Sequence, residues 1–397
     1  MPWSLGKMND RYEMAGKWKK GWTKAELAEH FHVSWRTIHK WVSRLERGEE
    51  NALEDRSRRP HSSPRRTCES IVKQLIKLKK KYPDWGPGKL VDLFPGGVRR
   101  MAPSTAGEIL KRAGYVRSRR RRRRSMPSAG PKIVMPGSGV MMTADYKGQF
   151  RLGIGQMCYP LTICDPASRF ILAIDAHERP CGKLAGPVFE RVFREHGLPD
   201  QILTDNGAPF SNASALGGLS ELSRDWIKLG ITALRIDPGK PQQNGRHERM
   251  HKSMMGRATS PPCHNSLSQQ KRFNSFRREF NFIRPHDALG KKTPASVHTP
   301  YRRQMPRRLP RMEYPDNMLV RRVRSNGQIR WRGQMVFISE VLIGELVGLL
   351  ETGDGTWDLY FGPVALALWD DRRNSLIAYR KPKQNRRKSV IKEKETV

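Results

Sequence analysis

The chain has 397 residues, which is enough for about two to four domains with cores of their own. Its 75 lysines and arginines against 38 aspartates and glutamates leave a formal net charge of +37, which favours a polyanionic partner, with DNA or RNA ahead of an anionic membrane surface. No apolar run of about 18 residues is present, so we expect no membrane-spanning helix and no membrane partner. The N-terminus lacks a secretory signal and the five cysteines are scattered, so we expect a cytoplasmic protein with reduced thiols.

Residues 1–60 have the pattern of a helix-turn-helix unit, with an ordinary helical hairpin as the alternative. Thr23 and Glu26 have the spacing of a capping box, Ser34 can cap a second helix, and Gly48 can end it. The N-terminal half of that second helix would enter the major groove of DNA. The residues that we expect on the DNA side are Ser34, Arg36, Thr37, His39, Lys40 and Arg44.

Residues 61–117 repeat this plan less clearly. Helical spacing from Ile71 to Leu78, a Trp-Gly-Pro turn at 85–87 and a run from 103 to 114 predict three helices, the last capped by Ser104 and ended by Gly114. We expect a second DNA-binding unit that presents Ser104, Thr105 and Lys111 to DNA.

The linker at 118–137 contains six consecutive arginines, which cannot pack into a core. We expect it to lie along DNA phosphates, with a solvated linker that makes no specific contact as the alternative. The six are Arg119, Arg120, Arg121, Arg122, Arg123 and Arg124.

Between 138 and 299 the pattern predicts a mixed α/β domain. Three β-type runs at 139–153, 158–170 and 170–180 predict an antiparallel meander, followed by helices at 182–197, 219–230, 241–256 and 268–289 and strands at 200–210 and 231–238. A basic, Pro-rich linker at 300–317 precedes short strands at 318–382, which predict a small β-barrel. Residues 383–397 form a polar tail that we expect to be disordered.

Three acids of the α/β domain stand where chemistry could occur. Asp145 lies in the apolar run MMTADY, Asp205 follows the strand-like segment ILT, and Glu248 lies in the first turns of a helix. Each one alone is most simply a capping or solvated acid. Together, converging carboxylates can hold two hard divalent cations about 4 Å apart, an arrangement that cleaves phosphodiesters.

The segments MMTADYKG, LTICDPASR, ILTDNGAPF and GKPQQNGRHERMHK resemble the catalytic core of the DDE transposases in the retroviral-integrase superfamily. The branch most similar is that of bacterial insertion sequences with two N-terminal helix-turn-helix units, and the resemblance covers residues 20–300. It implies an RNase H-like mixed sheet in which Asp145, Asp205 and Glu248 are the catalytic residues and the ligands of two Mg²⁺ or Mn²⁺ ions. Asp165 matches a recurrent position that is not catalytic.

The resemblance also implies an activity and partners. The activity is Mg-dependent cleavage of DNA at the ends of an element and strand transfer into target DNA, which amounts to DNA integration and recombination. The partners are double-stranded DNA, as terminal inverted repeats and as target, and further copies of the chain. Near the acids, we expect DNA contacts from Asn206, Arg246, Arg249 and Lys252. The alternative is a DNA-binding protein without catalysis, such as a regulator or a decayed transposase copy.

The chain departs from the superfamily's pattern at three places. Between Asp205 and Glu248 lie 42 residues, against roughly 35 in many integrases, and we interpret the excess as a loop insertion near 211–223. The N-terminal region has only Cys68, so the zinc domain of retroviral integrases is not expected. Met255 stands where many relatives have a basic residue, so Lys252 or Arg257 would have to contact DNA instead.

A zinc peptidase is a further alternative, because His247-Glu248-Arg249-Met250-His251 spells H-E-x-x-H. The extended zinc signature is absent, however, and the neighbouring Arg249 and Lys252 disfavour a cation held by neutral imidazoles. We therefore expect Glu248 to be a ligand of Mg²⁺ and the two histidines to pack in the core or face DNA.

Overall fold

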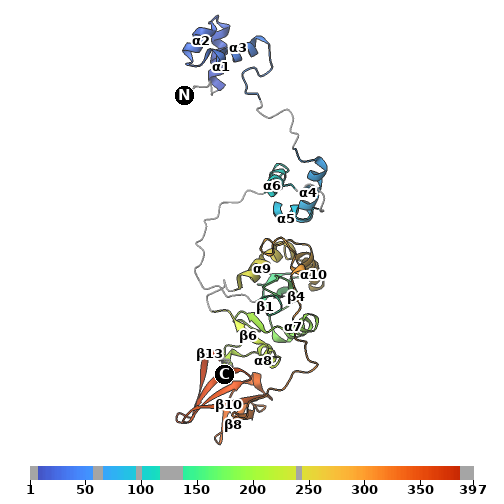
Figure 1. Cartoon of the computed structure of the whole chain (residues 1–397), viewed down its shortest axis with the longest axis vertical. Helices are drawn as coiled ribbons and strands as arrows, with labels where there is room; N and C mark the ends of the chain where they lie inside the picture. Colours follow the sequence, from blue (N-terminus) through green and yellow to red (C-terminus); the bar gives the residue numbers. More distant parts are fainter. Residues whose placement is uncertain (1–7, 57–65, 95–100, 117–136, 238–243, 385–397) are drawn as a thin grey trace, which may run out of the picture. The chain divides into compact units, whose positions relative to one another are not determined.

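The computed structural model describes residues 8–56, 66–94, 101–116, 137–237 and 244–384 (Figure 1). The chain divides into two compact units, Met1–Cys68 and Glu69–Val397. Within the described residues, no helix is both long enough and apolar enough to cross a membrane.

The first unit contains three helices, α1 (Met8–Lys19), α2 (Lys24–His30) and α3 (Trp35–Glu46). The predicted caps are confirmed, because Thr23 and Glu26 form a capping box on α2 and the Ser34 side chain accepts a hydrogen bond from the Thr37 amide of α3. Helix α1 was not predicted, since its apolar residues do not form a clear stripe. It nonetheless completes the core by packing Met14 against Leu27 and Ile38.

The second unit begins with three more helices, α4 (Glu69–Lys81), α5 (Pro87–Val91) and α6 (Pro103–Arg112), around a core that includes Leu75, Trp85 and Leu110. Gly114 adopts a φ of +75° just after α6, as expected of a helix end. The prediction that Ser104 caps α6 is wrong. Ala102 is the N-cap and Pro103 occupies the first turn, so the helix begins earlier than the hydroxyl residue.

A mixed sheet forms the centre of the second unit. Its strands are β1 (Met141–Tyr146), β2 (Phe150–Arg151), β3 (Met157–Cys164), β4 (Ile171–His177), β5 (Gln201–Thr204) and β6 (Thr232–Arg235). The predicted meander is confirmed, because β3 pairs antiparallel with β1 and with β4. On its other side, β1 pairs parallel with β5, which pairs parallel with β6.

Helices cover both faces of this sheet (Figure 1). Helices α7 (Gly182–His196) and α8 (Glu221–Lys228) pack on one face, where Met142 and Leu161 meet Phe189 and Trp226. Helices α9 (Gly245–Ala258) and α10 (Ser266–Phe282) pack on the other. Because side chains alternate along a strand, Thr143 and Asp145 face the α9 side while Met142 faces the α7 side. This alternation places Asp145 on the face of the sheet that α9 covers.

The C-terminal strands form an open sheet in the order β13-β12-β11-β10-β7 and a separate hairpin of β8 and β9. Their bounds are β7 (Leu319–Arg322), β8 (Gln328–Trp331), β9 (Gln334–Phe337), β10 (Leu346–Gly353), β11 (Thr356–Phe361), β12 (Val364–Asp370) and β13 (Ser375–Gln384). Among the described residues, no pairing joins β13 to β7, so the predicted barrel is not observed. The hairpin is formed by the chain between β7 and β10 and does not bridge the two edges.

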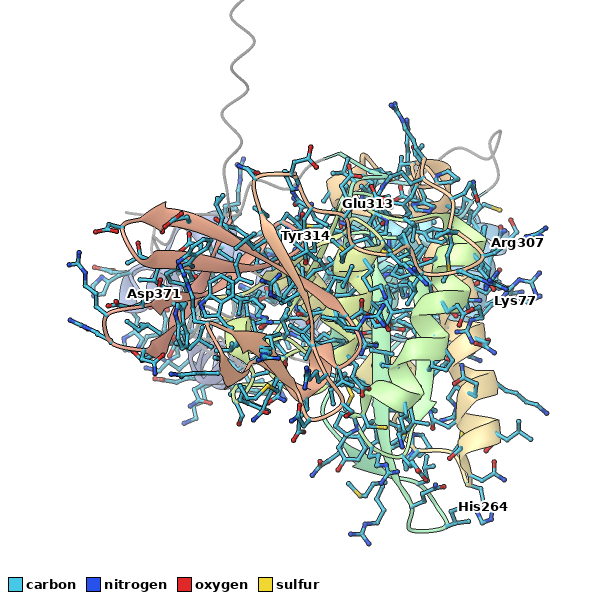
Figure 2. All side chains as sticks on the ribbon, turned by 90° about the horizontal axis from the view of Figure 1, so that it is seen from below. Lys77, His264, Arg307, Glu313, Tyr314 and Asp371 are labelled. Atoms are coloured by element: carbon cyan, nitrogen blue, oxygen red, sulfur yellow. The ribbon has the colours of Figure 1, made fainter. Side chains whose placement is uncertain are left out.

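Short 3₁₀ helices lie at Leu216–Gly218 (η1), Asp287–Leu289 (η3), Pro294–Ser296 (η4) and Glu340–Leu342 (η5). The Pro-rich segment before β7 is anchored by Tyr314, labelled beside the C-terminal strands in Figure 2. Its hydroxyl donates to the Leu346 carbonyl at 2.7 Å and accepts from the Gly362 amide at 3.1 Å. This part of the predicted linker is therefore held on the C-terminal sheet.

Candidate active site

Asp145 and Asp205 lie side by side at the C-terminal ends of two parallel strands. In the pairing of β1 with β5, Thr143 stands opposite Leu203, and continuing that register by two residues brings Asp145 opposite Asp205. The Gly207 amide donates to Asp205 Oδ1 at 3.1 Å, which fixes this carboxyl just beyond the end of its strand. The prediction that Asp205 follows the end of a strand thus has a direct geometric basis, and Asp145 lies within β1 as expected.

The Asp145 carboxyl is in a strained electrostatic environment. Its side chain is 20% exposed, and burial, assisted by the carboxyls of Asp205 and Glu248, raises its pKa to about 7 against the opposing effect of Lys147. Burial also raises the pKa of Asp205, although its bond from Gly207 opposes the rise. A raised pKa of this kind is typical of carboxylates that lie close together with too little positive charge between them.

Glu248 lies in the first turn of α9, exposed, and near enough for its charge to act on Asp145. Across the described residues, no three His, Cys, Asp or Glu side chains are grouped closely enough to hold a metal ion. The donor chemistry nevertheless fits a hard divalent cation, because carboxylate oxygens converge and the charge of Lys147 does not offset burial and the neighbouring carboxyls. Asp145 and Asp205 would hold such an ion, and Glu248 would complete the oxygen set.

The two histidines of the H-E-x-x-H segment face inward from α9, and both are buried. His247 contacts Thr143 Oγ1 through Nδ1 at 2.9 Å and Thr162 Oγ1 through Nε2 at 2.6 Å, and His251 Nε2 contacts the same Thr162 oxygen at 2.7 Å. Burial lowers the pKa of His247 to about 3 and that of His251 to about 2, so both rings are neutral. With these nitrogens already bonded, the segment is not built as a zinc site.

These contacts connect the helix of Glu248 to the strand of Asp145. Thr162 lies on β3 opposite Asp145 in the antiparallel pair and also donates to the Asp145 carbonyl at 2.9 Å. One hydroxyl therefore joins β1, β3 and α9 directly beneath the acids. The sequence contains no local signal for this cluster, because Thr143 and Thr162 are distant from α9 along the chain.

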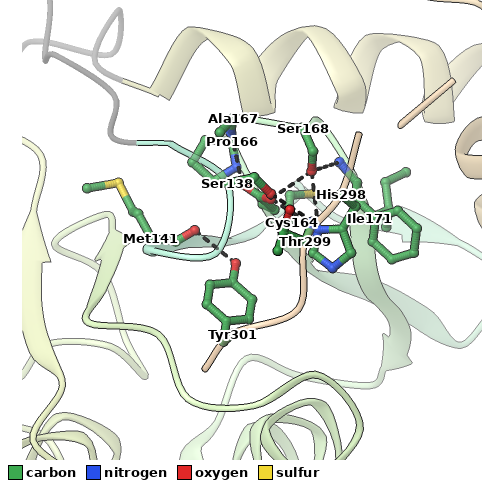
Figure 3. A network of polar contacts seen from close by, with 12 residues as sticks. Ser138, Met141, Cys164, Pro166, Ala167, Ser168, Ile171, His298, Thr299 and Tyr301 are labelled. Atoms are coloured by element: carbon green, nitrogen blue, oxygen red, sulfur yellow. Dashed lines mark hydrogen bonds and ion pairs between the residues drawn. The ribbon is translucent and has the colours of Figure 1, made fainter. Parts of the chain in front are cut away.

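Figure 3 shows a separate polar network that includes Ser138, Ala167, Ser168 and His298. Asp165, which the resemblance marks as non-catalytic, is fully buried. It accepts hydrogen bonds from the Ser138 hydroxyl, from Ser168 Oγ at 2.7 Å, from the Ala167 amide at 2.9 Å and from His298 Nδ1 at 3.1 Å. Burial alone would raise the pKa of Asp165, but these bonds lower it. The buried Ser168 hydroxyl and His298 thus help to satisfy the oxygens of this buried carboxylate.

The predicted DNA contacts of the first unit lie mostly on one exposed side of α3. Arg36, His39 and Lys40 are exposed and Thr37 is half-buried. Two others have partners within the unit. Ser34 caps α3, and Arg44 donates to the Glu54 carbonyl at 3.1 Å and lies over the Trp41 ring.

The remaining predicted contacts are distributed differently. Ser104, Thr105, Lys111, Arg246, Arg249 and Lys252 are exposed. The Asn206 amide donates to the Ile236 carbonyl at 2.8 Å, which ties the loop after β5 to the end of β6. Arg257 is paired with Glu279 at 2.9 Å, which leaves the exposed Lys252 as the better of the two substitutes for Met255. Arg119 to Arg124 lie outside the described residues.

Family models match three segments of the chain. Residues 229–294, which include Glu248, match an integrase core domain. Residues 10–61 match a helix-turn-helix domain, and residues 37–110 match a homeodomain-like domain. Along the chain, the match to an integrase core domain therefore follows the matches to helix-turn-helix and homeodomain-like domains.

Among curated proteins, the insertion element IS476 uncharacterized 39.2 kDa protein of Xanthomonas euvesicatoria is 27% identical over 146 residues. That match spans 36% of this chain and 40% of the relative's length. Solved structures with a similar chain include the HTLV-2 integrase catalytic core domain in complex with magnesium, in its trimeric form, with 14% identity, a TM-score of 0.33 and coverage of 41% of this chain and 98% of that one. Another is the simian T-cell lymphotropic virus intasome in complex with PP2A regulatory subunit B56 gamma, with 15% identity, a TM-score of 0.36 and coverage of 78% and 98%.

Proposed function

We propose that this chain, a DDE-type member of the integrase superfamily, is the transposase of an insertion element, which cleaves DNA at the element's ends and transfers the strands into target DNA. The observation that carries the proposal is the register that sets Asp145 beside Asp205, with the charge of Glu248 acting on the same carboxyl. A chain with a net charge of +37 has the overall potential that a DNA substrate requires.

Different residues of the chain have different roles in the proposed reaction. Asp145, Asp205 and Glu248 would supply carboxylate oxygens to Mg²⁺ or Mn²⁺, two ions in all. The chemistry that such ions supply is activation of the attacking oxygen and stabilisation of the leaving oxygen in an in-line displacement at phosphorus. Thr162 and the two histidines keep β1 and α9 in place, and the exposed Lys252 lies one helical turn from Glu248, where it can contact a DNA phosphate.

DNA recognition falls to the two helical units. The exposed face of α3 with Arg36, His39 and Lys40 would read the terminal repeats, and the exposed start of α6 with Ser104 and Thr105 would extend the site. The arginine run at 119–124 and the C-terminal strands would hold phosphates of the ends and of the target. Strand transfer of paired ends requires more than one active site, so we propose a homo-oligomer assembled on DNA in the bacterial cytoplasm, at the nucleoid.

The test is a nicking assay with the full chain on duplexes that carry the element's ends. Asp205→Asn removes one charged oxygen ligand without changing side-chain size, and we expect it to lose Mg²⁺-dependent nicking by at least about a hundredfold, the typical cost of removing one transition-state electrostatic contact. The matched control is Asp316→Asn, which changes an exposed acid far from β5 in sequence and should nick like the wild type. Equal nicking by Asp205→Asn and the wild type would overturn the proposal.

A DNA-binding protein without catalysis is the second hypothesis. One observation favours it, namely that within the described part of the chain the acids are not grouped as a three-residue metal site. It predicts end binding without nicking by the wild type in Mg²⁺ or Mn²⁺, so the same assay decides between the two.

A further inference from the structure

Helix α9 has a second polar face besides the one that carries Glu248. Arg246, Arg249 and Ser253 line a cavity of about 210 Å³. Glu248 lies two positions from Arg246, roughly 200° around a helix with 3.6 residues per turn, so the acid and the cavity occupy different sides. The other walls come from the turn after β3, the end of α10, the segment at 284–288 and α5.

The cavity is lined mainly by cations. Five basic side chains contribute to its wall, namely Lys89, Arg169, Arg246, Arg249 and Arg284. Of the two acids there, Asp165 is fully buried and already accepts four hydrogen bonds, and the exposed Asp287 is shared by Lys89 and Lys291. Throughout the described residues, no carboxylate pairs with Arg169, Arg246 or Arg249.

The cations lie close enough to repel one another. Burial lowers the pKa of Arg169, and the charges of Arg246 and Arg249 lower it further. Arg246 is held by a hydrogen bond from Nη1 to the Pro166 carbonyl at 2.8 Å, so it cannot easily swing away. Grouping like charges in this way is costly unless an anion joins them.

Two buried polar atoms at the cavity also lack hydrogen-bond partners. Arg284 Nε and His286 Nε2 are buried without a hydrogen bond, and both residues belong to the wall. Native proteins leave few buried polar atoms unpaired. Guanidinium groups in a fixed array suit a ligand with several oxygen acceptors, and a phosphate provides these.

From the cavity, its unpaired guanidinium groups and the location on α9, we infer a binding site for one backbone phosphate of a DNA strand, formed by Arg169, Arg246, Arg249 and Arg284. Its volume is many times the roughly 10–15 Å³ that a cavity needs to hold one water molecule, so a phosphate group fits. The choice of DNA over a free phosphate rests on the proposed function and on the shared helix, because a strand held here is fixed relative to Glu248.

The site is tested by the salt dependence of DNA binding by the full chain, measured by fluorescence anisotropy with a labelled duplex of arbitrary sequence. The double variant Arg169→Gln/Arg249→Gln should bind more weakly, and its plot of log affinity against log salt should be shallower by about 0.9 for the phosphate contact that is lost. The control is Arg278→Gln, an exposed arginine of α10 outside the cavity, which should keep the wild-type slope. An unchanged slope in the double variant overturns the inference.

A second measurement covers the case in which the double variant does not fold. Hydrogen exchange of the wild-type chain should slow at 166–169 and 284–288 when the duplex is added, and no slowing there overturns the inference. Calorimetry with inorganic phosphate and with a deoxynucleoside monophosphate distinguishes a site for a free anion from a site for a DNA phosphate. Tight binding of either one, with an unchanged DNA slope in the double variant, shows a free-anion site and rejects the DNA assignment. Neither readout needs strand cleavage, so failure of the nicking assay leaves both results interpretable.

Discussion

At the scale of single residues, Asp145 determines how the site responds to pH. Its pKa rises from an ordinary 3.8 to about 7, so between these values the folded chain holds a proton that the unfolded chain releases. Without a divalent cation, stability therefore falls as the pH rises through this window.

Asp145→Asn removes this penalty. In EDTA at pH 8 we expect the variant to be more stable than the wild type by on the order of a few kcal/mol, seen as a higher unfolding temperature, and this margin should nearly vanish by pH 4. Thermal unfolding followed by circular dichroism across this range checks it, with Asp316→Asn as the control. A margin that is independent of pH would show that Asp145 is not the source.

Gly207 controls the position of the second acid. A Cβ at Gly207 would lie 3.2 Å from Asp205 Oδ2, so Gly207→Ala must displace the carboxylate slightly. We expect nicking to fall by about tenfold or more and to need more Mg²⁺, with little change in unfolding temperature, since small displacements at a reacting centre are costly. The control is Gly256→Ala in α9, where a Cβ meets nothing within 4 Å and should leave nicking unchanged.

At the scale of elements, the Thr162 hydroxyl decides whether α9 is seated on the sheet. Thr162→Val keeps the volume but leaves His247 and His251 without their shared partner, at a cost of about 1–3 kcal/mol for buried polar groups. In Thr162→Val, we expect both nicking activity and the free energy of unfolding to fall. Thr162→Ser keeps the oxygen and should restore nicking, an outcome that simple packing loss would not give, because serine is the smaller residue.

Zinc analysis of the wild-type protein should find no stoichiometric zinc.

Elements with strong local patterns could be predicted from the sequence. The apolar runs around Asp145 and Thr162 gave strands with the expected antiparallel pairing, and the cap residue Ser34 marked the start of α3. Helix α1 was missed because its pattern is weak and its core contacts, such as Met14 with Leu27, come from tertiary packing. The prediction of a barrel was wrong because the alternation of side chains along strands does not specify whether a sheet closes.

The residues of the candidate site also differ in whether the sequence could predict them. The sequence marked Asp145 as a carboxylate in an apolar strand, Asp205 at a strand end and Glu248 at a helix start, and the resemblance then grouped the three. The roles of His247 and His251 could not be predicted, since their partners lie on β1 and β3, far away in sequence. The cavity arginines Arg169 and Arg284 were missed for the same reason, because only the folded chain brings them to Arg246.

At the scale of the whole molecule, the segment between β5 and β6 joins the central sheet to the C-terminal strands. Leu219 and Ile227 are buried in one core with Leu349 and Leu366. Lys228 pairs with Glu345 at 2.6 Å, with both side chains largely buried. The central and C-terminal sheets therefore share apolar surface and should unfold together.

Calorimetry should show two unfolding transitions, a small one for the first unit and a large one for residues 69–397 together. Gly217→Ala tests the shared surface, because Gly217 has a φ of +63° and its Cβ would lie 2.7 Å from Leu366. We expect the variant to lower the large transition and leave the small one unchanged. Separate transitions for the central and C-terminal sheets would contradict this assignment.

The shared Thr162 hydroxyl has one more consequence, which concerns where protons reside. A hydroxyl has a single hydrogen, and here it is directed to the Asp145 carbonyl. His247 Nε2 and His251 Nε2 both lie within hydrogen-bond distance of the Thr162 hydroxyl oxygen, and His251 Nδ1 lies 3.7 Å from Asp145 Oδ2. Because burial and the neighbouring carboxyls raise the pKa of Asp145 to about 7, the arrival of a divalent cation near neutral pH should release up to one proton per chain to solvent.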